Sequence, residues 1–326
     1  MRECISEVMY PMDTAVHKGV KARRLPLIAL FALLCMAFSI ASAEERSGMI
    51  RVSYLGPEGT YTQEAAQFFF AGGGTLIPKE TVGLSIEDLL SGEADYAVIP
   101  QENTVGGPVA GYLDALISAE GVYVVGEVVL PISQTLMGVP GAALDGIRTV
   151  CSHAQGLAQS AQWREEHLPD AAVMEMPSTA AAASYVAEQQ DQSIAAVAAP
   201  GAAALYGLEV LAENIQITDA NKTRFYVLSR IPSDEEGSTR AVFVVTCAAD
   251  RIDDIIAAVH ETGLELVALH DRPQGTALGE YHFVVECENL EGVTDEQIAA
   301  VSGMAGVRLL GCFRTVEKCA GAEAKP

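Results

Sequence analysis

A hydroxyl, an amide and two cations lie side by side in the run Asn221-Lys222-Thr223-Arg224-Phe225. The chain has a formal net charge of -23, and the only Lys or Arg residues between Glu80 and Asn221 are Arg148 and Arg164. Two cations that flank one threonine are therefore a local exception in an acidic sequence. Because an arginine can pair bidentately with a carboxylate and a threonine can donate a hydrogen bond without charge, the run predicts a site for a small anion.

Two further polar clusters follow apolar runs that predict strands. Pro100 to Gly107 places an acid, an amide and a hydroxyl consecutively, in Glu102, Asn103 and Thr104. A simple turn does not need the glutamate, so this trio predicts groups that orient a polar ligand or a catalytic hydroxyl. In Ser152-His153-Ala154-Gln155, Ser152 can cap the helix that follows, and His153 is either a functional group or a capping or core histidine.

A fourth junction, Gly56-Pro57-Glu58-Gly59-Thr60, lies between the first predicted strand and a helix. Backbone N–H groups at Gly59 and Thr60, together with the helix dipole, can hold a carboxylate. A structural turn with a threonine cap explains the same residues. Four polar junctions at strand ends nevertheless point together to one site.

The composition narrows the class of protein. The chain has 326 residues, 50% of them hydrophobic, which suffices for one large core or two smaller ones. Nucleic acid is not expected as a partner, because phosphate backbones are bound by clustered Lys and Arg, which this acidic chain lacks. The seven cysteines include no C-x-x-C pair and no His–Cys cluster with metal-ligand spacing, so we expect neither a disulfide framework nor a metal site.

From Met49 onward, short apolar strands alternate with helical segments, which predicts an α/β protein. The pattern breaks at Leu130-Pro131, and the chain is expected to return to its first part near Tyr206. These two points predict two lobes, with the chain crossing between them twice. Ligands of such proteins bind beyond the carboxyl ends of the strands, so we expect a cleft between the lobes. The predicted strands are 50–55, 94–100, 122–130, 148–152, 172–176, 193–198 and 225–228, and the predicted helices are 60–70, 86–90, 109–118, 155–167, 179–189 and 200–206.

Polar residues 231–239 predict a linker after the two lobes. Beyond the linker, residues 240–316 predict a small ferredoxin-like βαββαβ domain, and residues 317–326 a frayed tail. The expected elements of this domain are strand 241–247, helix 251–261, strands 264–269 and 281–287, helix 295–302 and strand 307–313.

Residues 1–48 fit two interpretations. Basic residues from Lys18 to Arg24, an uncharged stretch at 25–40 and Ala41-Ser42-Ala43 are typical of a secretory signal over residues 18–43. Met49, however, leads directly into the first predicted strand, as a cytoplasmic start would, and residues 1–48 would then be an over-extended start. On either interpretation these residues lie outside the fold.

Five segments, in chain order, resemble the signature blocks of the prephenate dehydratase family. They are Tyr54-Leu55-Gly56-Pro57-Glu58-Gly59-Thr60, Glu102-Asn103-Thr104 with Gly106, Leu130-Pro131-Ile132, Ser152-His153-Ala154-Gln155 and Asn221-Lys222-Thr223-Arg224-Phe225. The ferredoxin-like segment, with Leu269-His270-Asp271-Arg272-Pro273, resembles the regulatory ACT domain of this family. The resemblance implies a two-lobed, periplasmic-binding-protein-like catalytic domain at residues 49–230 and an ACT domain at 240–316.

The resemblance also implies a reaction, the conversion of prephenate into phenylpyruvate, water and carbon dioxide on the route to L-phenylalanine. Formation of an aromatic ring drives this step, so no cofactor is required. Thr223 would be the key catalytic residue, and His153 or Glu102 would complete proton transfer. The substrate would contact the rest of the polar segments, namely Gly59, Thr60, Asn103, Thr104, Ser152, Gln155, Asn221, Arg224 and Phe225. Since prephenate is made in the cytoplasm, the reaction favours a start at Met49.

The C-terminal domain departs from the family pattern where L-phenylalanine binds between paired ACT domains. His270-Asp271-Arg272-Pro273 replaces Glu-Ser-Arg-Pro, and Ala248-Ala249-Asp250-Arg251-Ile252 replaces a Gly-Ala-Leu run. We expect the domain to form a homodimer or homotetramer, whereas L-phenylalanine as an effector stays an open alternative. Two other functions stay open as well, a periplasmic solute-binding protein for a small carboxylate and a dehydratase that accepts arogenate.

Overall fold

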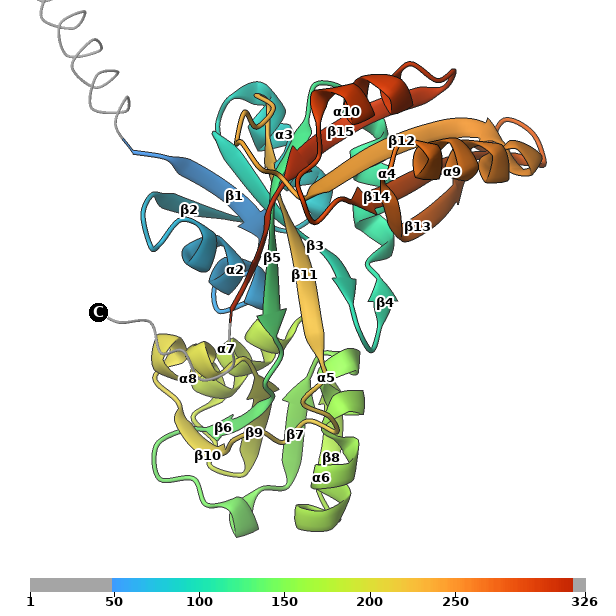
Figure 1. Ribbon diagram of the computed structural model, residues 1–326. Helices are drawn as coiled ribbons and strands as arrows, with labels where there is room; N and C mark the ends of the chain where they lie inside the picture. Colours follow the sequence, from blue (N-terminus) through green and yellow to red (C-terminus); the bar gives the residue numbers. More distant parts are fainter. Residues whose placement is uncertain (1–48, 319–326) are drawn as a thin grey trace, which may run out of the picture. The chain divides into compact units, whose positions relative to one another are not determined.

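Three β-sheets carry the fold of residues 49–318, the part of the chain that the computed structural model describes (Figure 1). The signal-like segment 18–43 and most of the expected tail, residues 319–326, lie outside the described residues. Among the described residues, no helix is long and apolar enough to cross a membrane.

The first lobe is built on a sheet whose strand order is β16-β5-β11-β3-β1-β2, with β4 attached to β3. Strands β1, β2 and β3 run parallel, and β11 lies antiparallel between β3 and β5. Helix α2 packs on one face of this sheet, and α3 and α4 pack on the other. The elements are β1 (Arg51–Leu55), α2 (Tyr61–Phe69), β2 (Thr75–Lys79), α3 (Val82–Ser91), β3 (Tyr96–Asn103), β4 (Gly107–Pro108), α4 (Ala110–Ser118), β5 (Tyr123–Pro131), β11 (Lys222–Ser229) and β16 (Thr315–Glu317).

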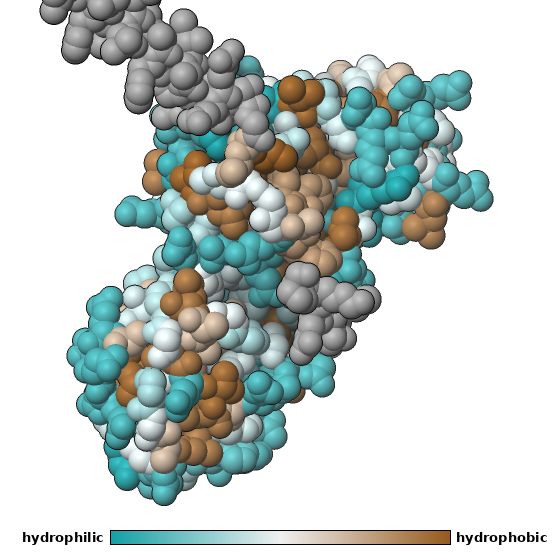
Figure 2. Space-filling model, turned by 90° about the vertical axis from the view of Figure 1, so that its left-hand side faces the viewer, coloured by the Kyte–Doolittle hydropathy of each residue, from teal (hydrophilic) through white to brown (hydrophobic). Residues whose placement is uncertain are grey.

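The second lobe has a five-stranded sheet in the order β10-β6-β9-β7-β8. Its core is made largely of alanines from α7, α8 and β9, because small side chains let these helices approach the sheet closely. Apolar residues also reach the surface among polar ones on the face of this lobe that Figure 2 shows. The elements are β6 (Thr135–Gly138), η1 (Leu144–Gly146), β7 (Thr149–Ser152), α5 (Ala154–Gln159), α6 (Ala161–His167), β8 (Ala172–Glu175), α7 (Thr179–Gln189), β9 (Ile194–Ala198), α8 (Pro200–Tyr206) and β10 (Glu209–Ala212).

Three predictions for the two lobes need correction. The expected single helix 155–167 is two helices, because Ser160 donates its hydroxyl to the carbonyl of Gly156 (2.7 Å) and ends α5. The chain returns to the first lobe after β10 rather than near Tyr206, since β10 first pairs with β6. Strand β11 begins at Lys222 rather than at Phe225, so the predicted turn residues 222–224 lie in the sheet.

The C-terminal domain has the strand order β13-β14-β12-β15, all antiparallel, which confirms the predicted ferredoxin-like order. A capping box formed by Thr294 and Gln297 starts α10. The elements are β12 (Arg240–Ala248), η2 (Ala249–Arg251), α9 (Ile252–Glu261), β13 (Glu265–Pro273), β14 (Glu280–Glu288), α10 (Asp295–Ser302) and β15 (Val307–Phe313).

The C-terminal domain shares a core with the first lobe. Val242, Val284 and Phe313 pack with Tyr112 and Tyr226 in one buried cluster. After β15, the chain joins the first-lobe sheet as β16, which runs parallel to β5, so the domain and the expected start of the tail are tied to the lobe. The linker at 231–239 therefore connects two parts that pack together rather than two separate bodies.

Candidate active site

A cavity of about 330 Å³ lies between the two lobes. Strands β3 and β11 and the start of α2 line it from the first lobe, and the starts of α5 and α7 line it from the second. Six of the residues predicted from sequence border this cavity, namely Thr60, Asn103, His153, Gln155, Thr223 and Phe225. The structure thus brings together all four polar junctions, although only some residues of each.

Thr223 and Asn103 form a cross-strand pair at one wall of the cavity. The register of β11 on β3 sets the two residues opposite each other, and Asn103 Nδ2 donates to Thr223 Oγ1 (2.8 Å). Because the threonine oxygen accepts this bond, its own proton is left to donate to a ligand.

Asn103 is held by four other hydrogen bonds. Its Nδ2 also donates to Asn221 Oδ1 (2.9 Å), and its Oδ1 accepts from the backbone N–H groups of Val105 (3.0 Å) and Gly106 (2.9 Å). Gln155 Nε2 donates to the same oxygen from the second lobe (2.9 Å). A side chain at Gly106 would come within 2.6 Å of Gln155 Nε2, so the glycine allows the lobes to meet here.

His153 lies at the other side of the cavity, at the start of α5. Its Nδ1 accepts from the backbone N–H of Gln155 (3.3 Å), which places the proton of the neutral ring on Nε2. His153 therefore caps the helix, as one sequence interpretation held, and also borders the cavity, as the other required.

Two buried glutamines in the cavity wall were missed from sequence. Gln134 Nε2 donates to Gln159 Oε1 (2.8 Å), while Gln134 Oε1 and Gln159 Nε2 have no partner. Both residues are only 3% exposed. An unpaired buried amide atom is unfavourable, and because both atoms are buried, a bound molecule reaches this acceptor and this donor only when the side chains turn toward the cavity. Only the adjacency of Gln134 to the Leu130-Pro131-Ile132 segment pointed toward it in the sequence.

The cavity has no formal positive charge in its wall. None of the described lining residues is Lys or Arg. Positive potential comes instead from backbone N–H groups at the starts of α2 and α7, which Thr60 and Ser178 cap. Burial raises the pKa of Tyr61, whose hydroxyl stays protonated and donates to the carbonyl of Ser133. Most of the rest of the wall is apolar and includes Leu55, Pro100, Val109, Ile132, Pro177 and Phe225.

Four of the predicted contact residues lie beside the cavity rather than on it. Ser152 is fully buried and donates to the carbonyl of Val197 (2.6 Å). Thr104 Oγ1 accepts from the backbone N–H of Lys222 (2.9 Å), and Asn221 supports Asn103. Gly59 borders a different cavity, next to α8. These side chains connect the elements that carry the site.

Arg224 and Glu102 are placed differently from the sequence prediction. Neighbouring residues of a strand face opposite sides, so Arg224 points away from the Thr223 side of the sheet. Its guanidinium donates from Nε to Glu127 (2.7 Å), from Nη1 to Glu102 (3.2 Å) and from Nη2 to Glu286 of the C-terminal domain. Burial would lower the pKa of Arg224, but the carboxylates of Glu286 and Glu127 raise it instead. Neither Arg224 nor Glu102 borders the cavity.

The segment expected to bind an effector contacts the first lobe. Arg272 forms a bidentate pair with Asp114 of α4, with both distances at 2.7 Å. The side chain of His270 is largely buried beside Tyr112, whereas Asp271 and Pro273 are exposed.

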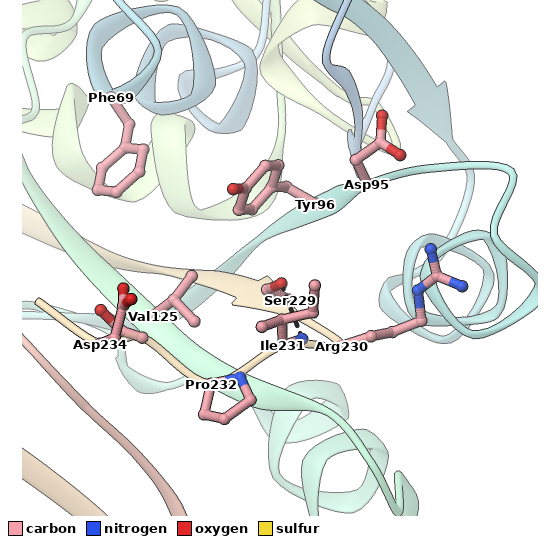
Figure 3. A pocket seen from close by; sticks show the side chains of 10 residues that line it. Phe69, Asp95, Tyr96, Val125, Ser229, Arg230, Ile231, Pro232 and Asp234 are labelled. Atoms are coloured by element: carbon pink, nitrogen blue, oxygen red, sulfur yellow. Dashed lines mark hydrogen bonds between the residues drawn. The ribbon is translucent and has the colours of Figure 1, made fainter. Parts of the chain in front are cut away.

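Another cavity lies where β11 leads into the linker (Figure 3). The rings of Phe69 and Tyr96 face Ile231 and Pro232 across it, and Arg230 extends away from the rings. Ser229 accepts from the backbone N–H of Ile231 (3.1 Å), and no lining residue has a buried unpaired polar atom. None of the predicted site residues borders this cavity, so the interlobe cavity is the stronger candidate.

The fold and the cavity place this chain in the class of two-lobed α/β proteins of the periplasmic-binding-protein type. A ferredoxin-like domain follows the two lobes. A family model described as prephenate dehydratase matches residues 52–233. A prephenate dehydratase of Amycolatopsis methanolica is 36% identical over 274 residues, which cover 81% of this chain and 88% of that protein. The chain belongs to the prephenate dehydratase family.

Two solved structures share this fold, and one of them is described as a prephenate dehydratase. Prephenate dehydratase from Arthrobacter aurescens, in complex with L-Phe, is 32% identical and has a TM-score of 0.74, covering 81% of this chain and 90% of that one. GqqA, described as a novel type of quorum quenching acylase, is 26% identical with a TM-score of 0.71, covering 82% of this chain and 98% of that one. These similarities confirm the predicted fold class.

Proposed function

We propose that the interlobe cavity converts prephenate into phenylpyruvate, water and carbon dioxide. Family membership supports the reaction, and one local observation carries its assignment to this cavity. Thr223 Oγ1 accepts from Asn103 and keeps a proton to donate, in a cavity whose described lining residues include no Lys or Arg. A hydrogen-bond donor is what a departing hydroxide needs.

The reaction removes two groups from one ring. The bond between the ring and its carboxylate breaks, its electron pair enters the ring, and the carbon–oxygen bond on the opposite side of the ring breaks as hydroxide leaves. Thr223 donates to that oxygen, and Asn103 fixes the orientation of Thr223. Hydroxide takes up one proton from solvent to become water. We assign to the Nε2–H of His153 a second hydrogen bond to the departing oxygen, because a neutral ring that lost this proton would become an anion. The wall of Leu55, Pro100 and Phe225 keeps solvent from the ring carboxylate.

The two carboxylates of prephenate would be held without a lysine or arginine. We assign one of them to the N–H groups at the start of α2, beside Thr60, or of α7, beside Ser178. The unpaired Nε2 of Gln159 is a further donor that we assign to the substrate, once the side chain turns toward the cavity. This replaces the sequence prediction that Arg224 contacts the substrate.

One assay separates this function from the open alternatives. The purified protein is mixed with prephenate, and phenylpyruvate is measured by its absorbance in alkali. Turnover supports a dehydratase. Binding of prephenate without phenylpyruvate would indicate a solute-binding protein, and conversion of arogenate in a parallel sample would show a wider substrate range.

The C-terminal domain is proposed to be a regulatory ACT domain that also mediates self-association. Edge strand β13 leaves Leu266 and Leu269 partly exposed, which supports a paired domain. Size-exclusion chromatography with light scattering measures the oligomer. Calorimetric titration with L-phenylalanine, followed by assays at the same concentrations, tests whether it binds and slows turnover.

The location of the protein is proposed from the substrate. Prephenate arises in the cytoplasm, which favours a protein that starts at Met49. Mass spectrometry of the native N-terminus distinguishes this start from cleavage after Ala43 and from an intact extension, because the three forms differ in mass.

A further inference from the structure

A buried carboxylate of the C-terminal domain contacts both strands that carry the Thr223–Asn103 pair. Glu286 is only 1% exposed and lies on β14. Its Oε1 accepts from Gln101 Nε2 on β3, and its Oε2 accepts from Arg224 Nη2 on β11. One side chain therefore bridges two neighbouring strands of another domain.

The bridge lies where the pairing of those strands is irregular. Thr223 pairs with Asn103 and Arg224 with Glu102, but Phe225 pairs with Pro100, so Gln101 is an extra residue in β3. Such a β-bulge changes the local twist and redirects nearby side chains, and bulges are frequent beside active sites. Gln101, the bulged residue, is the one that Glu286 holds.

The two faces of the first-lobe sheet are connected at this point. Thr223 and Asn103 face the cavity, while their neighbours Arg224 and Glu102 face the C-terminal domain and form an ion pair (3.2 Å). Arg224 is also paired with Glu127, which is 1% exposed and accepts from the hydroxyl of Thr315 (2.6 Å) at the start of β16. Three carboxylates fix one guanidinium, and that guanidinium has little freedom to move.

We propose that Glu286 is a positioning residue for the dehydratase reaction, which holds the β3 bulge and Arg224 so that Thr223 and Asn103 keep their geometry. The proposal rests on the function assigned to the cavity above. Glu286 touches no part of the cavity, so it acts only through the two strands. Glutamine at position 286 turns one of the two acceptor oxygens into an N–H donor, which weakens the contact with Gln101 or with Arg224, and the Thr223–Asn103 pair shifts.

The test compares Glu286→Gln with Glu288→Gln, a matched change on the same strand. Glu288 pairs with Arg240 inside the C-terminal domain (3.4 Å), and among the described residues no ion pair joins it to strands β3 or β11. We expect kcat for phenylpyruvate formation to fall about 10- to 100-fold in Glu286→Gln, with KM changed less than about threefold, because misplacement of a reacting group lowers rate more than binding. Glu288→Gln should keep the kcat of the wild type.

A double-mutant cycle separates positioning from general destabilisation. Arg224→Lys keeps the charge but cannot fork to several carboxylates, so the effect of Glu286→Gln on kcat should shrink in that background. Equal kcat in Glu286→Gln and Glu288→Gln, or purely additive effects with Arg224→Lys, would overturn the proposal. If the wild type itself forms no phenylpyruvate, the function assigned to the cavity fails instead.

Discussion

Replacement of Thr223 by valine tests the catalytic assignment most directly. Valine matches threonine in shape, and residue 223 is only 8% exposed, so the change removes a hydroxyl without opening a cavity. Asn103 Nδ2 loses its bond to Thr223 but keeps its bond to Asn221 Oδ1 (2.9 Å). The second hydrogen of the Asn103 amide is then left without its partner in a largely buried position, so the free energy of unfolding should fall by about 1–3 kcal/mol.

The effect on rate should be larger. Removal of one preorganised donor to a developing oxyanion lowers kcat about 10²- to 10³-fold, which corresponds to roughly 2.7–4 kcal/mol of transition-state stabilisation. Thr223→Ser keeps the hydroxyl, so most of its activity should remain. The assay is initial-rate formation of phenylpyruvate over a range of prephenate concentrations, with thermal unfolding of each variant as the control for folding.

The outcome can refute the reasoning in two ways. A Thr223→Val protein that is folded and turns over within about threefold of the wild type would show that the hydroxyl does not assist the departing group. A rise in KM with unchanged kcat would instead make Thr223 a binding residue, since uniform binding does not lower the barrier. Loss of activity in Thr223→Ser as well as Thr223→Val would point to packing rather than to the hydroxyl.

Three further predictions follow from the contacts described. Gln159→Leu removes the free amide donor from the cavity and should raise KM for prephenate about 10-fold, the value of roughly one lost hydrogen bond, with a smaller change in kcat. Gly311→Ala should lower the free energy of unfolding by several kcal/mol, because the added Cβ would lie 2.0 Å from the carbonyl oxygen of Val124. Urea unfolding measures this change. A decrease of less than about 1 kcal/mol would contradict the close packing of the C-terminal domain against the first lobe. A hydrogen bond from Arg51 lowers the pKa of Asp95, so Asp95→Asn should lower the free energy of unfolding by about 1 kcal/mol near neutral pH, after allowance for solvent screening. This difference should persist above the ordinary carboxyl pKa and vanish as pH falls through the lowered pKa of Asp95. Urea unfolding of both proteins at neutral pH and at acidic pH measures it.

The alternation of strands and helices was predictable because each element carries its own local signal. The buried strand β9 and the first half of β3 are continuous apolar runs, and helices α2 and α7 follow Thr or Ser caps. Short edge strands were missed. The strand β10 has two exposed residues and gains its order from pairing with β6, which is a contact between distant parts of the chain.

The sequence predicted that the polar junctions lie together, but not the direction of each side chain. The four junctions do meet at one cavity, since strand ends in such sheets converge. Whether a residue of a junction faces that cavity depends on strand register, and a shift of one residue reverses the face. Because β11 starts at Lys222, Thr223 faces the cavity and Arg224 does not. The two glutamines were missed for a related reason, because nothing in their local sequence marks a buried unpaired amide.

The location of Arg224 changes the interpretation of the two basic residues in the run from Asn221 to Phe225. Its charge is already matched by three carboxylates, two of them almost fully buried, so it has little attraction left for a dianion. An arginine in such a cluster acts through geometry, because its five donors fix neighbouring groups at set angles. Specific binding of the substrate must then come from N–H groups, amides and the Thr223 hydroxyl. Such groups do not change charge near neutral pH, so the affinity for prephenate should depend little on pH in this range.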